Sequence, residues 1–241
     1  DELDSLVESG LARQADSDTY DVHDLIREFL LQSLDTQSKE ELHSKAVVWY
    51  EKQPSSSQIS LELIYHLISS SRHEDATSII IDEGRDLVKE GHIELLGLLE
   101  SIDTKSVNAE GACRIDRLRG EVLALLGRFD EAEEAFNQAR PPAEAAGLKD
   151  VIADILSNLA DIALKRGDSE SSLGMHRKAL ELFIELKDAV GAARSYNNMG
   201  YILRRSGDNT KALDAYSEVE SILSEDKSCL LYTSDAADEW R

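Results

Sequence analysis

The chain has 241 residues, enough for one large domain or two small ones. Its 48 acidic and 26 basic residues give a formal net charge of −22, which repels phosphate backbones and anionic lipid surfaces. No apolar run is long enough to span a bilayer, and two cysteines are too few for a disulfide framework. The sequence therefore argues against nucleic-acid or membrane binding by the bulk surface and favours a cytoplasmic protein.

Residues 1–36 differ in pattern from the rest of the chain. Apolar positions between residues 3 and 11 predict a short amphipathic helix, and residues 11–22 read as a β-hairpin with a turn at 16–18. Asp24 can cap a helix that follows the hairpin. Helix, hairpin and helix in this order are the second half of a winged helix.

The segment 20–29 resembles the end of the winged helix in STAND or NB-ARC signalling ATPases. In that family a hydrophobic-His-Asp triplet closes the nucleotide-binding module, and Val22, His23 and Asp24 match it here. The resemblance implies that His23 contacts the β-phosphate of ADP in the intact protein, and an imidazole at a helix start suits an anion. The alternative is that His23 packs under the hairpin and Asp24 only caps its helix.

The sequence contains no Gly-x-x-x-x-Gly-Lys-Ser/Thr phosphate loop. The chain is therefore expected to be non-catalytic and to bind no cofactor of its own. It also starts without a methionine, so we expect an internal segment whose ATPase core, if there is one, lies upstream of Asp1.

Residues 37–110 are predicted to form a helical linker and degenerate helical repeats. Helices are expected over 39–52, 75–89 and 92–101, with one linker at 53–57 and a helical pattern from residue 59 onward.

Residues 111–226 carry a clear repeat. Gly127, Gly167 and Gly207 lie 40 residues apart, and each opens a turn that is followed by a small residue five positions later. A fixed period of this size is typical of stacked helical hairpins. The expected helices cover 113–126, 130–139, 151–165, 169–186, 191–205 and 210–223.

These hairpins resemble tetratricopeptide repeats, in which small residues mark the crossing of two helices and an aromatic residue follows in the second helix. The three repeats supply Gly120, Gly127, Ala132, Phe136 and Ala139; Ala160, Gly167, Ser172, His176 and Ala179; and Gly200, Gly207, Ala212, Tyr216 and Val219. His176 fills the aromatic position, which favours a packed core histidine over a ligand. The predicted fold class is all-α: a tetratricopeptide-like α-solenoid of antiparallel hairpins with a partial winged helix at its N-terminus.

In that family, partners bind the concave face formed by the first helices of the hairpins. Arg194, Asn197, Tyr201 and Arg204 share one stripe of the helix over 191–205, and Arg114 and Arg117 lie on the equivalent stripe two hairpins earlier. Such residues could receive an acidic peptide or protein. The alternative is a solvated helix face, and Asp154, Ser157 and Asp161 on the intervening stripe oppose a basic groove.

The C-terminal tail is set aside. Residues 227–241 include a stretch that resembles the translation of a transposase adapter used in shotgun DNA library preparation. The six histidines are scattered over different hairpins, so no metal site is expected, and no catalytic motif is present.

Three functions remain open. The first is the non-catalytic sensor region of a STAND-type signalling ATPase that binds a partner protein or effector, with oligomerisation of the intact protein left open. The second is a stand-alone tetratricopeptide adaptor without nucleotide coupling. The third is a transcriptional regulator whose winged helix binds DNA. The segment 3–11 carries no Lys or Arg, which argues against this function.

Overall fold

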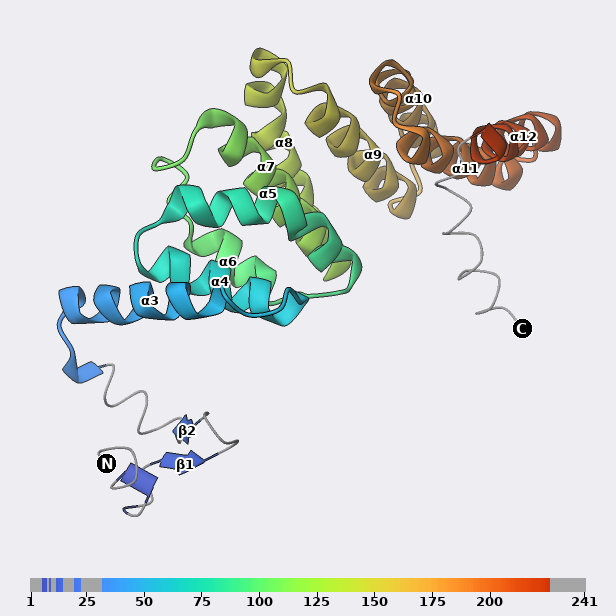
Figure 1. Cartoon of the computed structure of the whole chain (residues 1–241). Helices are drawn as coiled ribbons and strands as arrows, with labels where there is room; N and C mark the ends of the chain where they lie inside the picture. Colours follow the sequence, from blue (N-terminus) through green and yellow to red (C-terminus); the bar gives the residue numbers. More distant parts are fainter. Residues whose placement is uncertain (1–5, 8, 10–11, 15–19, 23–31, 226–241) are drawn as a thin grey trace. The chain divides into compact units, whose positions relative to one another are not determined.

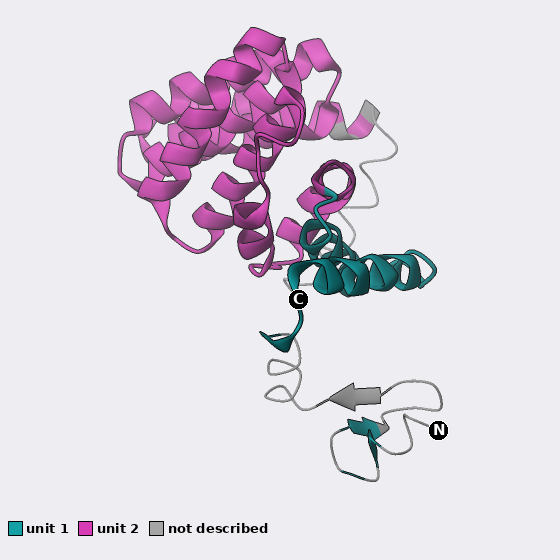
Figure 2. Cartoon of the chain, turned by 90° about the vertical axis from the view of Figure 1, so that its left-hand side faces the viewer, with its two compact units in different colours: residues 1–72 teal, residues 73–241 magenta. Residues whose placement is uncertain are grey.

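The structure is a computed structural model that describes residues 6–7, 9, 12–14, 20–22 and 32–225 (Figure 1). Within these residues it contains two short strands and ten helices, which confirms the all-α class. The chain divides into two compact units, residues 1–72 and residues 73–241 (Figure 2). The division falls inside the region 37–110 that the sequence pattern assigns to linker and degenerate repeats.

Unit 1 begins with the predicted β-hairpin. β1 (Ala12–Gln14) pairs antiparallel with β2 (Tyr20–Val22), and Ala12 lies opposite Val22. His23 and the helix expected after Asp24 lie outside the described residues, as does most of the helix expected over residues 3–11. The hairpin itself is confirmed, and the winged helix around it stays a prediction.

The second part of unit 1 is a helical hairpin of α3 (Thr36–Tyr50) and α4 (Ser57–Ser69). Helix α3 starts three residues earlier than expected because the Asp35 side chain accepts a hydrogen bond from the Ser38 amide at 2.8 Å. Ser56 caps α4 in the same way, through the Ile59 amide at 3.3 Å. Both caps satisfy amides that a helix start leaves without a partner.

Unit 2 is an array of helical hairpins. It consists of α5 (His73–Lys89), α6 (Leu95–Ser101), α7 (Ala109–Leu125), α8 (Phe129–Ala146), α9 (Lys149–Lys165), α10 (Ser169–Leu186), α11 (Ala189–Arg205) and α12 (Asn209–Glu225). We call α5, α7, α9 and α11 the A helices, and α6, α8, α10 and α12 the B helices. Helices α7, α9 and α11 start at residues 109, 149 and 189, so the 40-residue period of the sequence is also the period of the structure.

The turns between helices repeat with the same period. Gly127, Gly167 and Gly207 have φ values of +73°, +87° and +87°, a left-handed conformation that L side chains rarely adopt. The turns from one hairpin to the next also repeat, because Gly147 and Lys187 have φ values of 70° and 57°. The sequence identified the first set of turns and missed the second, in which one position is a lysine.

The small residues of the A helices have the predicted packing role. A Cβ atom on Gly120 would lie 2.6 Å from the ring of Phe136, and one on Gly200 would lie 2.6 Å from the ring of Tyr216. At the equivalent positions of the middle hairpin, Ala160 and His176 are both fully buried. The ring in the B helix therefore fills the space that a larger side chain in the A helix would occupy.

Helix α8 corrects one predicted boundary. The sequence ended this helix at residue 139, before Pro141 and Pro142, whereas the structure continues it to Ala146. Each proline removes one backbone hydrogen bond inside the helix. Ala139 and Ala143 are nevertheless fully buried, so the apolar face continues past the prolines and compensates for the lost bonds. Helix α6 is shorter than predicted, because it starts at Leu95 instead of residue 92.

Candidate interaction site on the A helices

Equivalent positions on successive A helices alternate in charge. Arg114 on α7, Asp154 on α9 and Arg194 on α11 lie 40 residues apart, at the same point of each hairpin. A like charge at all three positions would repel its neighbours, whereas the alternation places opposite charges on adjacent helices. The repeat therefore positions an ionic network as well as a core.

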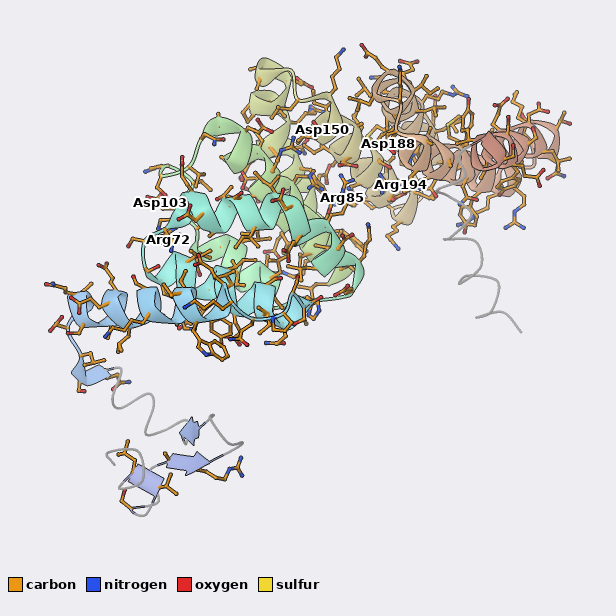
Figure 3. All side chains as sticks on the ribbon, in the orientation of Figure 1. Arg72, Arg85, Asp103, Asp150, Asp188 and Arg194 are labelled. Carbon is orange, nitrogen blue, oxygen red and sulfur yellow. The ribbon has the colours of Figure 1, made fainter. Side chains whose placement is uncertain are left out.

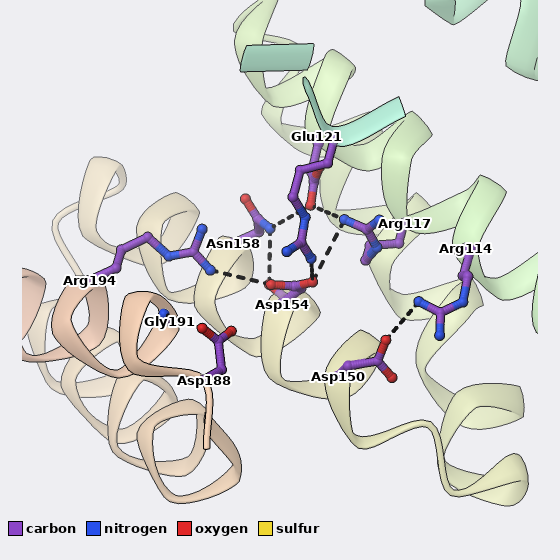
Figure 4. A network of polar contacts seen from close by, with 10 residues as sticks. Arg114, Arg117, Glu121, Asp150, Asp154, Asn158, Asp188, Gly191 and Arg194 are labelled. Carbon is purple, nitrogen blue, oxygen red and sulfur yellow. Dashed lines mark hydrogen bonds and ion pairs between the residues drawn. The ribbon is translucent and has the colours of Figure 1, made fainter. Parts of the chain in front are cut away.

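Asp154 is the centre of that network. Its side chain is 5% exposed and contacts three guanidinium groups from three other A helices (Figure 4). Arg85 of α5 pairs with Oδ2, Arg117 of α7 lies 3.8 Å from Oδ2, and Arg194 of α11 lies 3.3 Å from Oδ1. One buried carboxylate therefore connects α9 to α5, α7 and α11.

A second carboxylate also pairs with the buried arginine. Arg117 is 4% exposed and contacts Oε1 of Glu121 at 2.6 Å. The side-chain amide of Asn158 donates to the Asp154 carbonyl oxygen at 2.9 Å and to Glu121 at 3.4 Å. Breaking a buried pair by removing one partner typically costs about 3–5 kcal/mol, because an uncompensated charge stays behind.

Arg114 makes a separate link between α7 and α9. It contacts Asp150 at 2.7 Å and Glu110 at 2.9 Å. Burial raises the pKa of Asp150, but the hydrogen bond and the charge of Arg114 outweigh burial and hold that pKa below its usual range. Both carboxylates therefore satisfy Arg114 within the chain.

A groove of about 440 Å³ lies next to the network, between the A helices. We call it the A-helix groove. Its cations are Arg85, Lys89, Lys165 and Arg194, and its acids are Glu121 and Asp161. Its apolar lining consists of Val88, Ala124, Leu125, Phe129 and Ile162.

The groove presents charge next to exposed apolar surface. The side chains of Arg85 and Arg194 are 47% and 48% exposed, and both reach toward α9 (Figure 3). The Lys165 ammonium lies 5.6 Å from the centre of the Phe129 ring, a cation–π distance. Within residues 32–225, Lys165 has no carboxylate partner in the structure, and Leu125 beside it is 57% exposed. The groove therefore offers both ionic and apolar contacts to a ligand.

The six residues that the sequence singled out do not gather in one place. Arg117 is paired inside the network and Arg114 is paired with Asp150 and Glu110, so neither is open to a partner's carboxylate. Arg194 lines the A-helix groove. Asn197 and Arg204 are exposed on α11.

Tyr201 lies beside a second hollow of about 600 Å³, which shares Asp161 and Lys165 with the A-helix groove. The guanidinium of Arg205 lies 5.7 Å from the centre of the Tyr201 ring and donates a hydrogen bond to the Tyr201 hydroxyl at 3.3 Å.

Sequence reasoning missed Arg85, Lys89 and Lys165. For Arg85 and Lys89 the reason is a change of period, because α5 starts 36 residues before α7 instead of 40, whereas Lys165 lies on α9 within the regular 40-residue repeat. The same offset relates Gly91, with a φ of +84°, to Gly127. A search that allowed a 36-residue step would have placed Arg85 at the position equivalent to Glu121.

The comparisons with known proteins agree with this architecture. Residues 151–225, which cover most of α9 and all of α10 to α12, match a family model described as tetratricopeptide repeat. No curated protein sequence matches the chain significantly. Aspartyl phosphate phosphatase F from Bacillus subtilis is 13% identical with a TM-score of 0.55, over 93% of this chain and 68% of that one. At this identity the likeness shows the fold, which is a tetratricopeptide-like array of helical hairpins.

Two other solved structures resemble the chain with TM-scores below 0.5. One is a STAND signal-transduction ATPase with a tetratricopeptide-repeat sensor from Pyrococcus horikoshii, 20% identical with a TM-score of 0.48. The alignment covers 92% of this chain and 39% of that ATPase, so the chain spans well under half of its length. The other is BtubC from P. vanneervenii, 17% identical with a TM-score of 0.47, over 83% of this chain and 78% of that one.

None of the described helices is both long enough and apolar enough to cross a membrane.

Proposed function

We propose that unit 2 is a non-catalytic interaction module that holds a segment of a partner protein or peptide in the A-helix groove. The observation that carries this proposal is the position of Arg85 and Arg194. One buried carboxylate, Asp154, holds both side chains at the edge of the groove, while about half of each remains exposed. Groups that are already ordered lose little conformational freedom when a ligand binds.

The chemistry of the groove favours a segment that combines acidic and apolar side chains. Arg85, Arg117 and Arg194 bring three positive charges to the network, and the carboxylates that pair with them are those of Asp154 and Glu121. Lys165 adds a cation beside exposed Leu125. On a chain with a net charge of −22 this local excess of positive charge is distinctive, and it attracts carboxylates at short range.

Peptide display tests this proposal. A random peptide library is panned on the immobilised chain, and bound peptides are eluted with excess salt. Enriched peptides should carry an Asp or Glu next to a large apolar residue, because that pair matches Lys165 and Leu125. Enrichment of basic peptides, or of peptides that bind Lys165→Glu as tightly as the wild type, would contradict the proposal.

We also propose that the chain is part of a STAND-type signalling ATPase in which His23 links the array to bound ADP. This rests on the Val22-His23-Asp24 triplet and on the hairpin β1–β2 that leads into it. The test uses the full-length protein: His23→Ala should speed ADP release, because an imidazole that donates to the β-phosphate is lost. An unchanged rate of ADP release would remove the proposed role of His23.

A further inference from the structure

Two histidines of unit 1 face each other across the hairpin of α3 and α4. His43 lies on α3 and His66 lies on α4, 23 residues later, and their Nδ1 atoms are 2.8 Å apart. Both side chains are partly buried. In the sequence these residues look scattered, and only the antiparallel packing of the two helices brings them together.

Both rings are neutral near pH 7. Burial lowers the pKa of His43. Burial, and secondarily the charge of His43, lower the pKa of His66 to about 4. A neutral imidazole keeps one nitrogen with a free lone pair, which is the form that binds a metal ion. Neither ring therefore has to lose a net proton when an ion binds.

The separation of the two nitrogens fits a shared ion. Imidazole nitrogens bind Zn²⁺ at about 2.0–2.1 Å, so two of them on one ion lie about 2.9 Å apart in a square-planar arrangement and about 3.3 Å apart in a tetrahedral one. The observed 2.8 Å is the length of the hydrogen bond between the two metal-free rings, and it brings both nitrogens close enough together to share one ion. We propose that His43 and His66 form a two-histidine site for a divalent transition metal, with Cu²⁺ bound most tightly.

The metal-free pair has a simple proton arrangement. One ring donates its Nδ1 proton to the other Nδ1 atom, which is the hydrogen bond in the structure. When an ion binds, the donor ring moves this proton to Nε2 by exchange with water. Both Nδ1 lone pairs then face the ion, and the two rings release no net proton.

Water fills the other coordination positions. Within the described part of the chain, no group of three or more His, Cys, Asp or Glu residues is placed to hold one ion. Aromatic side chains fix the two imidazoles instead: Tyr50 stacks on His66 with ring centres 5.2 Å apart, and Tyr65 meets His43 edge-on at 5.5 Å. An open site of this kind follows the general affinity order in which Cu²⁺ exceeds both Ni²⁺ and Zn²⁺.

Trp49 provides the measurement. It lies against Tyr50, with ring centres 4.8 Å apart, and it is 50% exposed. The chain has two tryptophans, so Trp240→Phe leaves Trp49 as the only fluorophore of this type. Bound Cu²⁺ quenches nearby indole fluorescence, so the fluorescence of Trp49 reports occupancy of the site.

The experiment titrates the full chain carrying Trp240→Phe with CuCl₂, NiCl₂ and ZnCl₂ at about pH 7.4, where both rings are neutral. We expect saturable quenching by one equivalent of Cu²⁺, at least tenfold weaker binding in His43→Gln and His66→Gln, and unchanged binding in the control His92→Gln. The electron paramagnetic resonance spectrum of the unmutated copper complex should show coupling to two nitrogens. Equal quenching in all variants, or coupling to fewer than two imidazole nitrogens, would overturn the proposal.

Discussion

At the scale of single residues, the sequence and the structure assign opposite roles to Asp154. In the sequence, an acid on the stripe between Arg114 and Arg194 opposes a basic groove. In the structure that acid is the group that holds Arg85 and Arg194 at the groove. Spacing along a helix shows which face a residue shares, but it does not show which neighbouring helix supplies its partner.

Asp154→Asn removes the central charge and keeps the shape of the side chain. Because Arg117 then stays buried with one partner fewer, we expect the free energy of unfolding to fall by about 3 kcal/mol, the low end for a broken buried pair. Urea denaturation followed by circular dichroism measures this loss. The control Asp214→Asn lies on an exposed position of α12 and should stay within about 0.5 kcal/mol of the wild type. Equal losses in both variants would contradict the central role of Asp154.

His66 gives unit 1 a defined dependence on pH. The unfolded chain protonates this ring near the ordinary histidine pKa of 6.5, whereas the folded chain holds its pKa at about 4. As the pH falls through this window the unfolded state binds more protons, so stability should decrease between about pH 6.5 and 4 and be independent of this ring at higher pH. His66→Gln should flatten the curve of unfolding free energy against pH in this window. A curve of unchanged slope in the variant would show that the ring is not protected from protonation.

At the scale of helices and turns, the sequence predicts what local geometry dictates. The helix expected over 169–186 is α10 with the same bounds, because a glycine turn precedes it and Lys187 ends it in a left-handed conformation. The end of α8 could not be predicted, because buried Ala139 and Ala143 carry the helix through two prolines. The 36-residue step before α7 was missed because the search kept a fixed 40-residue period, although Gly91 lies 36 residues before Gly127 in an equivalent turn.

Two glycine substitutions separate helix propensity from packing. Alanine is favoured over glycine inside a helix by roughly 1 kcal/mol. At Gly174 a Cβ atom would meet nothing within 4 Å, so Gly174→Ala should raise the unfolding free energy. At Gly120 it would lie 2.6 Å from the Phe136 ring, and overpacking of about 1–3 kcal/mol should outweigh the propensity gain. Thermal melting should move in opposite directions for the two variants, and a rise for both would contradict close crossing of α7 and α8.

At the scale of the whole molecule, the repeat organises both packing and charge. In unit 2 the same 40-residue period places glycines at turns, rings against small residues, and opposite charges on adjacent A helices. The sequence was sufficient to predict the array and the helices that carry the site. It could not identify Lys165 or Arg85 as groove residues, because that assignment requires the side-by-side packing of four helices.

The most direct test of the account is a charge exchange across the A-helix groove. A peptide selected by display is titrated calorimetrically into the wild type, into Lys165→Glu, and into the matched control Lys178→Glu on α10, which lies outside the groove. We expect Lys165→Glu to weaken binding at least tenfold, equivalent to about 1.4 kcal/mol, and the control to bind normally. Replacing the peptide's acidic residue by lysine should restore affinity for Lys165→Glu. Equal binding by all three proteins, or no restoration, would contradict the proposal that this groove is the interaction site.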